Sequence, residues 1–394
     1  MSDKGRAATH GSGLTTEKKS SDREATATSY NAEKAPPRID FIDTLRGLAV
    51  LLVLWDHLVG HYLMKSHLSW WPHSVIHMYV NVPLGIIQDF GWFGVCLFFL
   101  VSGYVITHVA QRETVRQFTI RRLLRIYPPL ALAILLAMLL APGSGESVVG
   151  DWSKVLWGMT LLNYLIVPQN VVLGVGWTLV IEMLFYSLVA LQTLWFRSRP
   201  RMSVFLNLAV CAATIACCRK LGDSFFLLAA SIAFIPYLVL GQIFYLRSRG
   251  IVGNRFLMTA VVTAFAVAQY GIREIHTDFL PLNNSYLLSF VVAMGVFVIA
   301  MLVNLRPSRA ILFSAQISYS LYLVHGPVGF AALGLSMRWG APYSIALCLA
   351  IAAVFGVAYA LHRLVERPSR RLARQWTESR APKVPQGKAP VLSP

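Results

Sequence analysis

Arg46 and His57 are the residues whose types and spacing point most directly to chemistry. They lie eleven residues apart in the apolar stretch 41–63. At about 100° per residue, eleven steps end about 20° past three full turns, so both side chains share one helix face, about 16 Å apart along the axis. Ionisable residues at membrane depth are costly and often functional. The pair indicates a site that holds an anion at one end and an acid–base group at the other.

Three acidic residues in apolar segments are further candidates. Asp43 precedes Arg46 by three residues, so the two side chains can pair at the end of the helix. Asp56 lies about 100° off the face shared by Arg46 and His57, so we expect it to orient a different group. Glu182 interrupts an otherwise uncharged apolar run, where a buried carboxylate needs a partner or a proton. A structural ion pair to an arginine is the alternative for Glu182.

Two other helical segments carry polar residues. Ser318, Tyr322 and His325 recur at helical spacing, which allows them to line a polar cavity or to form an interhelical hydrogen-bond seam. Ser102 and Gly103 are adjacent in a second apolar segment, and small residues there favour close helix packing. Packing is therefore the expected role of Ser102.

A cluster of arginines precedes the third apolar segment. Arg121, Arg122 and Arg125 would lie at the start of a helix on the cytoplasmic side. Guanidinium groups bind phosphate in a bidentate manner, so the cluster is a candidate phosphate site. The positive-inside distribution of membrane proteins explains the same charges without a ligand.

The composition predicts the elements that position these residues. The chain is 56% hydrophobic and 13% charged, whereas soluble domains are about 25% charged. The net charge of +17 resides mostly in short loops and tails, which argues against nucleic-acid binding. We expect an all-α, polytopic transmembrane bundle with these spans: 41–63, 86–109, 126–141, 176–196, 202–218, 224–246, 256–271, 285–305, 311–335 and 342–365.

Charge in the loops predicts the orientation of the bundle. If the short segment 155–167 is re-entrant or interfacial, the basic loops all fall on one side of the membrane. Both termini are then cytoplasmic, in an inner (plasma) membrane. We expect a disordered tail at 1–38, a membrane domain at 39–370 and a basic, disordered tail at 371–394. The five cysteines lack metal-ligand spacing with histidines, and we expect no bound metal.

Six motifs in one order resemble the acyltransferase 3 family of integral-membrane O-acyltransferases, over roughly 38–370. Met183 and Gly326 depart from residues common in that family. The motifs are an Arg-x10-His spacing in an Asp-x-x-Arg-Gly context at Arg46 and His57, then Phe99–Tyr104, Arg121–Pro129, Trp177–Tyr186, Ser318–His325 and Glu366–Pro368.

The resemblance implies transfer of an acyl group, often acetyl, from cytoplasmic acyl-CoA to a hydroxyl. The acceptor would be a carbohydrate, a lipid-linked glycan or a natural product, and membrane lipids would surround the protein. His57 would act as general base or carry the acyl group, with Asp43 and Glu182 as further catalytic residues. The donor would meet Arg46, Arg121, Arg122 and Arg125. The substrate would meet Trp177, Ser318, Tyr322 and His325.

Two other functional classes fit parts of the pattern. A secondary transporter could relay protons through His57 and Glu182. Such transporters often contain two halves with matching broken helices, and the sequence shows no second copy of the Arg–His helix. A catalytically inactive scaffold would not need Arg46, His57 and Glu182 together.

Overall fold

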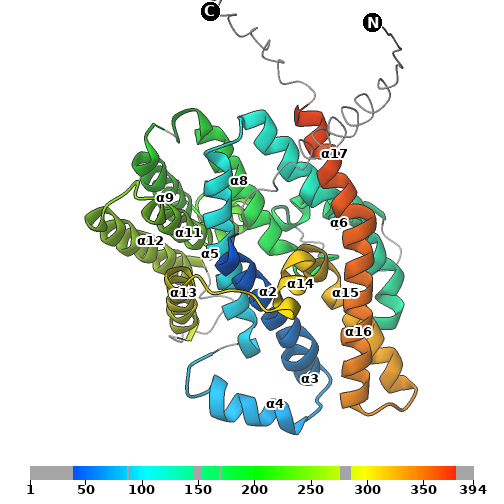
Figure 1. Cartoon of the computed structure of the whole chain (residues 1–394). Helices are drawn as coiled ribbons and strands as arrows, with labels where there is room; N and C mark the ends of the chain where they lie inside the picture. The colour runs from blue at the N-terminus through cyan, green and yellow to red at the C-terminus, as the bar shows by residue number, and fades with distance from the viewer. Residues whose placement is uncertain are drawn as a thin grey trace, which may run out of the picture. The chain divides into compact units, whose positions relative to one another are not determined.

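The computed structural model of the protein describes residues 39–86, 88–144, 152–167, 171–196, 198–275 and 285–378 (Figure 1). Every regular element in these ranges is a helix, as predicted. The expected tail 1–38 and the residues after 378 lie outside the described part of the chain.

The helices follow one another along the chain with short connections. The first half contains α2 (Asp40–Trp55), η1 (Asp56–His61), α3 (Tyr62–Lys65), α4 (Trp71–Ile76), η2 (His77–Asn81), η3 (Gln88–Phe90), α5 (Gly91–Ala110), α6 (Val115–Ser144), α7 (Trp152–Thr160), η4 (Leu162–Tyr164) and α8 (Gly176–Phe196). The second half contains α9 (Pro200–Ala216), α10 (Asp223–Ile232), α11 (Ile235–Ser248), α12 (Asn254–Ile275), α13 (Ser285–Val303), α14 (Arg309–Gln316), α15 (Ser318–Arg338), α16 (Tyr343–Leu361), η6 (His362–Glu366) and α17 (Arg367–Glu378).

Eight helical segments of the described chain are long and apolar enough to cross a membrane. Two further apolar helices, Gly176–Gln192 and Pro200–Ala216, are shorter. The protein is therefore a multi-span membrane protein. The eight segments are Asp40–Lys65, Gln88–Ala110, Val115–Leu140, Asp223–Ser248, Asn254–Ile275, Tyr286–Val303, Ser318–Arg338 and Tyr343–Glu378.

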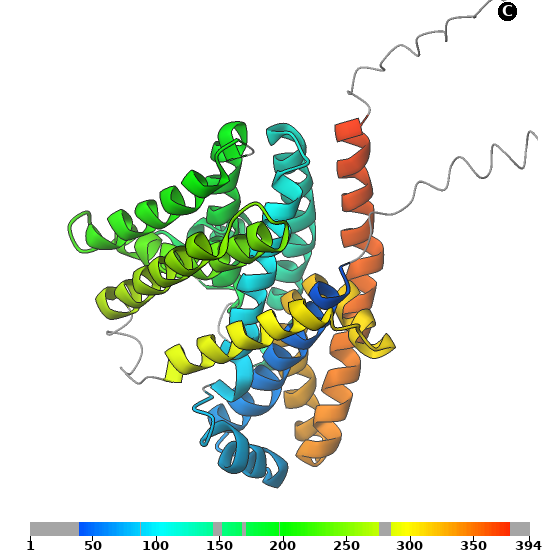
Figure 2. The ribbon, with the colours of Figure 1, turned by 60° about the vertical axis from the view of Figure 1, so that its left-hand side comes forward.

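In Figure 1, α2 and α5 lie between two groups of helices, with α9, α12 and α13 on one side and α15 and α16 on the other. In Figure 2, α9 and α12 remain on one side and α15 and α16 on the other, whereas α13 overlaps α2 and α5. Phe41 contacts Tyr104 and Asp56 lies against Gly91, so α2 and α5 are antiparallel. Because Gly91 has no side chain, the Asp56 carboxylate can approach the backbone at the start of α5.

The packing of α5 on α11 depends on glycine. A Cβ atom on Gly103 would overlap the carbonyl of Leu238, and one on Gly241 would overlap the carbonyl of Leu100. The two backbones therefore approach more closely than larger residues allow. The side chain of Ser102, next to Gly103, is left on another face of α5.

Helix α6 begins well before the expected start at residue 126. Thr114 and Gln117 form a capping box, in which the Gln117 amide donates to the Thr114 hydroxyl at 3.3 Å and the Thr114 amide donates to the Gln117 side chain at 3.0 Å. The arginine cluster is consequently inside α6, some residues beyond its first turn, and not at the start of the helix as expected. The signal was present in the sequence as Thr-x-x-Gln.

The expected helix 311–335 was wrong in one respect, because it is two helices. Helix α14 ends at Gln316 and α15 begins at Ser318, with Ile317 outside helical geometry between them. At the other end of the chain, α17 extends to Glu378, beyond the expected boundary at 370. Its buried face contains Ser369, Ala373 and Thr377, which recur every four residues.

Helix α7 corresponds to the short segment expected not to cross the membrane. Its nine residues extend only about 14 Å, roughly half of a bilayer core. Nearby, the Tyr164 hydroxyl donates to the Leu173 carbonyl. Burial raises the pKa of the Tyr164 phenol, so the group remains protonated and keeps this donor role. The contact holds the chain that leads into α8.

Candidate active site

Two cavities lie along the face of α2 that carries Arg46 and His57. The first has a volume of about 70 Å³ and lies where α2, α5, α6, α8 and α15 meet. It brings together residues that are distant in sequence. Its polar lining includes Arg46, Ser102, Arg125, Thr178, Glu182, Tyr186, Ser318, Tyr319 and Tyr322.

Glu182 is the acidic group of this first cavity. Ser102 donates to the Glu182 carboxylate at 3.1 Å, and the Tyr186 hydroxyl donates to the same oxygen. Arg46 and Arg125 line the cavity beside it, so the carboxylate lies among hydrogen-bond donors and two cations. Ser102 therefore makes a polar contact in addition to the expected packing.

Arg46 also pairs with Asp43, as its spacing predicted. The two side chains are 3.8 Å apart, at the start of α2. Asp43 is absent from the lining of both described cavities. It therefore contacts the candidate site through Arg46.

The three arginines of α6 have different surroundings. Arg121 forms ion pairs with Glu113 at 2.8 Å and with Glu378 of α17 at 3.1 Å. Arg122 is buried, with its guanidinium 5.5 Å from the centre of the Phe118 ring. Of the three, Arg125 alone lines the first cavity.

The second cavity is larger, with a volume of about 740 Å³, and includes His57. It is bounded by the π-helical turn η1, by α4 and η2, and by the starts of α5 and α8. Trp177, a substrate contact expected from the sequence, contributes an aromatic wall. The titratable residues of the lining are Asp56, His57, His61, His73, His77 and Asp89.

The hydrogen bond of His57 assigns its tautomer. Nδ1 lies 3.0 Å from the Val53 carbonyl, which can only accept, so Nδ1 carries the proton and Nε2 is the basic atom. The nearest carboxylate is that of Asp56, 3.6 Å from Nδ1. Glu182 lies instead in the first cavity. Asp56 also lies against Gly91 of the neighbouring helix α5, so its orienting a different group stays a prediction. The π-helical turn that begins at Asp56 changes the register of the side chains here.

His325 lies directly behind His57. The two rings meet edge to face, with centroids 4.7 Å apart, and His325 is only 1% exposed. Its Nδ1 lies 2.8 Å from the Tyr322 carbonyl. Helix α15 thus presents polar side chains toward α2, but His325 lies against the candidate base and outside the lining of both cavities.

The two cavities meet at Val95 and Tyr322, which line both. The Tyr322 hydroxyl hydrogen-bonds to Thr178 at 2.8 Å, and its ring packs edge-on against Phe98. Arg46 and His57 therefore open into neighbouring cavities with a shared wall. This arrangement can hold an extended molecule whose charged end and reactive end are separated.

A comparison of the sequence with protein-family models agrees with these observations. Residues 39–363 match the family model described as an acyltransferase domain. The chain belongs to the acyltransferase 3 family. No curated protein and no solved structure was found to match it. The protein is thus a membrane acyltransferase, and its match includes every candidate residue described above.

Four residues around His57 in this acyltransferase were missed by sequence reasoning. His61 follows His57 by four residues, and His73 precedes His77 by four, a spacing that places each pair on one helix face. That spacing was a usable signal. Asp89 had none, because it joins the histidines only through the turn before α5.

Proposed function

We propose that this acyltransferase moves an acyl group, acetyl in the simplest case, from cytoplasmic acyl-CoA to a hydroxyl of a saccharide, glycan precursor or natural product. The observation that carries the proposal is the pair of adjoining cavities, one with Arg46 and Arg125 and the other with His57. The donor occupies the arginine side, and the acceptor occupies the larger cavity.

The donor side suits a molecule with phosphates and a slender arm. Arg46 and Arg125 provide two guanidinium groups, which bind phosphate oxygens in a bidentate manner. The cavity of about 70 Å³ is small, so it favours a slender segment, such as part of the pantetheine arm, over a bulky group. The thioester would then reach the junction at Tyr322.

The chemistry follows from the tautomer of His57. Nε2 accepts the proton of the acceptor hydroxyl as its oxygen attacks the thioester carbonyl. The tetrahedral intermediate collapses, the carbon–sulfur bond breaks, and the leaving thiolate takes the proton from the His57 imidazolium. The products are an ester and free coenzyme A thiol. Asp56, 3.6 Å from Nδ1, stabilises the imidazolium that forms during the step.

The acceptor side suits a hydroxyl-rich molecule. The cavity of about 740 Å³ combines the Trp177 ring with several histidine and aspartate side chains. An aromatic wall and polar groups together favour a saccharide ring or a glycosylated natural product over a bare hydrocarbon. Polysaccharide and macrolide-type acceptors both fit this description.

The direct test is thioester consumption by the purified full-length protein. Acetyl-CoA should yield free thiol at a rate that rises with added hydroxyl acceptor, and His57→Ala should abolish that rise. A protein that binds acetyl-CoA but never releases thiol with any acceptor would contradict the proposal. The transporter alternative is less favoured, because Glu182 is hydrogen-bonded in the first cavity and is not beside His57.

A further inference from the structure

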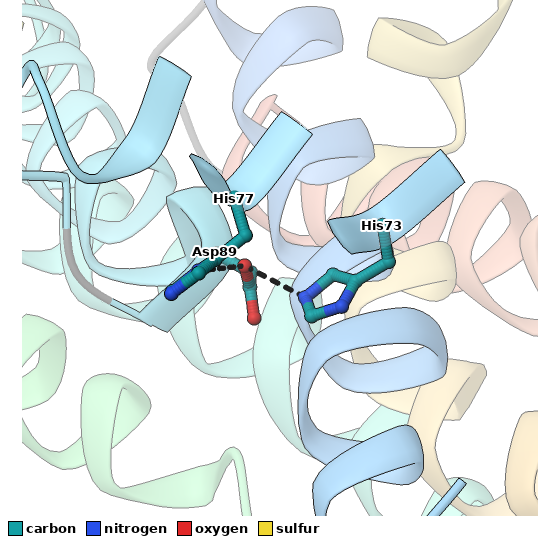
Figure 3. A group of neighbouring side chains, drawn as sticks. All are labelled: His73, His77 and Asp89. Carbon is teal, nitrogen blue, oxygen red and sulfur yellow. Dashed lines mark ion pairs between the residues drawn. The ribbon is translucent and has the colours of Figure 1, made fainter. Parts of the chain in front are cut away.

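His73, His77 and Asp89 form a compact cluster in the second cavity (Figure 3). His73 Nε2 lies 3.0 Å from Asp89 Oδ1, and His77 Nδ1 lies 3.7 Å from the same atom. The three potential ligand atoms all lie within 4.8 Å of one another. One helical turn separates the histidines, and the turn before α5 supplies the aspartate.

These distances match the ligand set of a small cation. Ligands about 2.1 Å from a tetrahedral Zn²⁺ lie about 3.4 Å from each other, and the two separations above bracket that value. His73 Nε2 is buried and, among the described residues, has no hydrogen-bond partner of good geometry. His73 Nε2 is close to the Asp89 carboxylate, but the two groups do not have the geometry of a hydrogen bond. Two atoms directed at a shared ion have that relationship.

The surroundings of Asp89 hold its carboxylate in place. Asn81, which is 1% exposed, donates from Nδ2 to Asp89 Oδ1 at 2.7 Å. Such an outer hydrogen bond orients a ligating carboxylate. A Cβ atom on Gly60 would overlap the Asp89 carboxylate, so the glycine leaves room for it one turn beyond His57.

The backbone of the turn that contains Asp89 has an unusual conformation. Gln88, Asp89 and Phe90 all have positive φ, at 50°, 41° and 75°. Non-glycine residues rarely adopt this region, because the Cβ atom then comes close to the backbone carbonyl oxygen, which is unfavourable. The turn delivers the carboxylate to the histidines at that cost, which a bound ligand would offset.

We propose that His73, His77 and Asp89 bind a divalent transition-metal ion, with Zn²⁺ the best match. Two imidazoles and one carboxylate leave a fourth position open in a tetrahedral site, as in zinc enzymes. The ion would also balance the carboxylates of Asp56 and Asp89, which line the same cavity. This replaces the sequence-based expectation of no metal.

The open position gives the ion a role in the proposed function, on which this step rests. All three ligands line the cavity that includes His57. A hydroxyl or carboxylate oxygen of the acceptor is the ligand class that would complete the site. The ion would hold the acceptor, and the His57 imidazole would remove the proton from the hydroxyl that reacts.

Metal binding can be measured without donor or acceptor. Metal-free full-length protein in detergent is titrated with ZnCl₂ by calorimetry, and the Co²⁺-loaded protein is examined by visible absorption. We expect one ion per chain and a tetrahedral Co²⁺ spectrum. His77→Ala is the main variant, because that side chain is 56% exposed and its loss should not unfold the protein.

His77→Ala and Asp89→Asn should each weaken Zn²⁺ binding by at least about 100-fold, since outer-shell changes alone cost 10–100-fold. His108→Ala is the matched control, because His108 packs on Tyr245 away from the cavity and should keep wild-type affinity. Unchanged affinity in the His77 and Asp89 variants, or an ion lost only with His57→Ala, would overturn the site.

The acceptor role has a separate readout. Chelation should raise the KM for the acceptor and leave donor binding unchanged. An acceptor KM that is the same with and without Zn²⁺ would overturn the contact between ion and acceptor. The titration succeeds or fails independently of acyl transfer, so failure of the metal site and failure of the proposed function can be distinguished.

Discussion

The hydrogen bond from His57 Nδ1 to the Val53 carbonyl leaves Nε2 as the basic atom of the ring. The Nδ1 contact with Val53 comes from one turn earlier in the same helix, so it is independent of any ligand. Asp56 adds a carboxylate on the same side of the ring. In the proposed mechanism, His57 would therefore be oriented for proton transfer before substrate arrives.

Replacing His57 by alanine should abolish acyl transfer while the protein remains folded. General acid–base assistance contributes about 10²–10⁴-fold, so thiol release should fall by at least that range. His108→Ala serves as the matched control and should retain wild-type turnover. Near-normal turnover in His57→Ala, measured with the protein monodisperse in detergent, would remove His57 from the mechanism.

Arg46→Ala and Arg125→Ala should weaken coenzyme A binding. A charge-assisted hydrogen bond is worth about 1.5–3 kcal/mol, which corresponds to about 10- to 100-fold in Kd. Lysine should rescue only part of this, since it lacks the bidentate fork. Arg306→Ala is the control, because that side chain is 85% exposed and outside both cavities. Equal donor affinity in all of these variants would place the phosphates elsewhere.

At the scale of elements, the α5–α11 contact positions the polar face of α5. Gly103 and Gly241 let the two backbones approach, and Ser102 is thereby directed toward Glu182 of α8. A larger residue at Gly103 would move α5 away from α11. The first cavity, which Ser102 and Glu182 line, would change shape as a result.

Gly103→Ala should destabilise the protein by about 1–3 kcal/mol, the usual cost of overpacking. The new methyl group would overlap the Leu238 carbonyl, and a backbone atom cannot rotate away. Gly356→Ala is the matched control on α16, where the added methyl meets no atom within 4 Å and should stabilise the helix by up to about 1 kcal/mol. The midpoints of thermal unfolding of the two variants in detergent measure these changes in stability. Midpoints that move in the same direction would contradict the close approach.

At the scale of the whole molecule, helix directions constrain the topology. Helix α2 is antiparallel to α5, and the contacts Phe99–Trp177 and Ser102–Glu182 make α5 parallel to α8. The end of α3 and the end of α8 therefore point to opposite sides of the bundle. We propose cytoplasmic termini, ten crossings and no crossing by α7, with the loop after α8 on the cytoplasmic side.

Cysteine labelling tests this topology at two exposed positions in a cysteine-free background. An impermeant thiol reagent should label Ser66→Cys in intact cells, because that position follows α3 at the outer end. Ser198→Cys, between α8 and α9, should label only after the inner face is opened. Ser147, in the segment between α6 and α7 that we also expect on the outer side, lies outside the described residues. Labelling of Ser198→Cys from outside would exclude the ten-crossing topology.

Helix periodicity and apolar length were enough to predict several features of this protein. They predicted the all-helical bundle, the shared face of Arg46 and His57, and the pairing of Arg46 with Asp43, because these depend on neighbours within one helix. The match to the acyltransferase 3 family over residues 39–363 agrees with the motifs. The bundle, the shared face and the Arg46–Asp43 pair could be predicted because each depends on residues that are close in sequence.

Only the tertiary structure decided how the polar residues are divided. It placed Glu182 with Arg46, because spacing along one helix does not determine which helices adjoin. The cluster of His73, His77 and Asp89 also required the fold, since a turn with three positive φ angles brings the aspartate to the histidines. Contacts between elements also depend on how closely backbones approach, as at Gly103 and Gly241, and the periodicity of a sequence does not determine that distance.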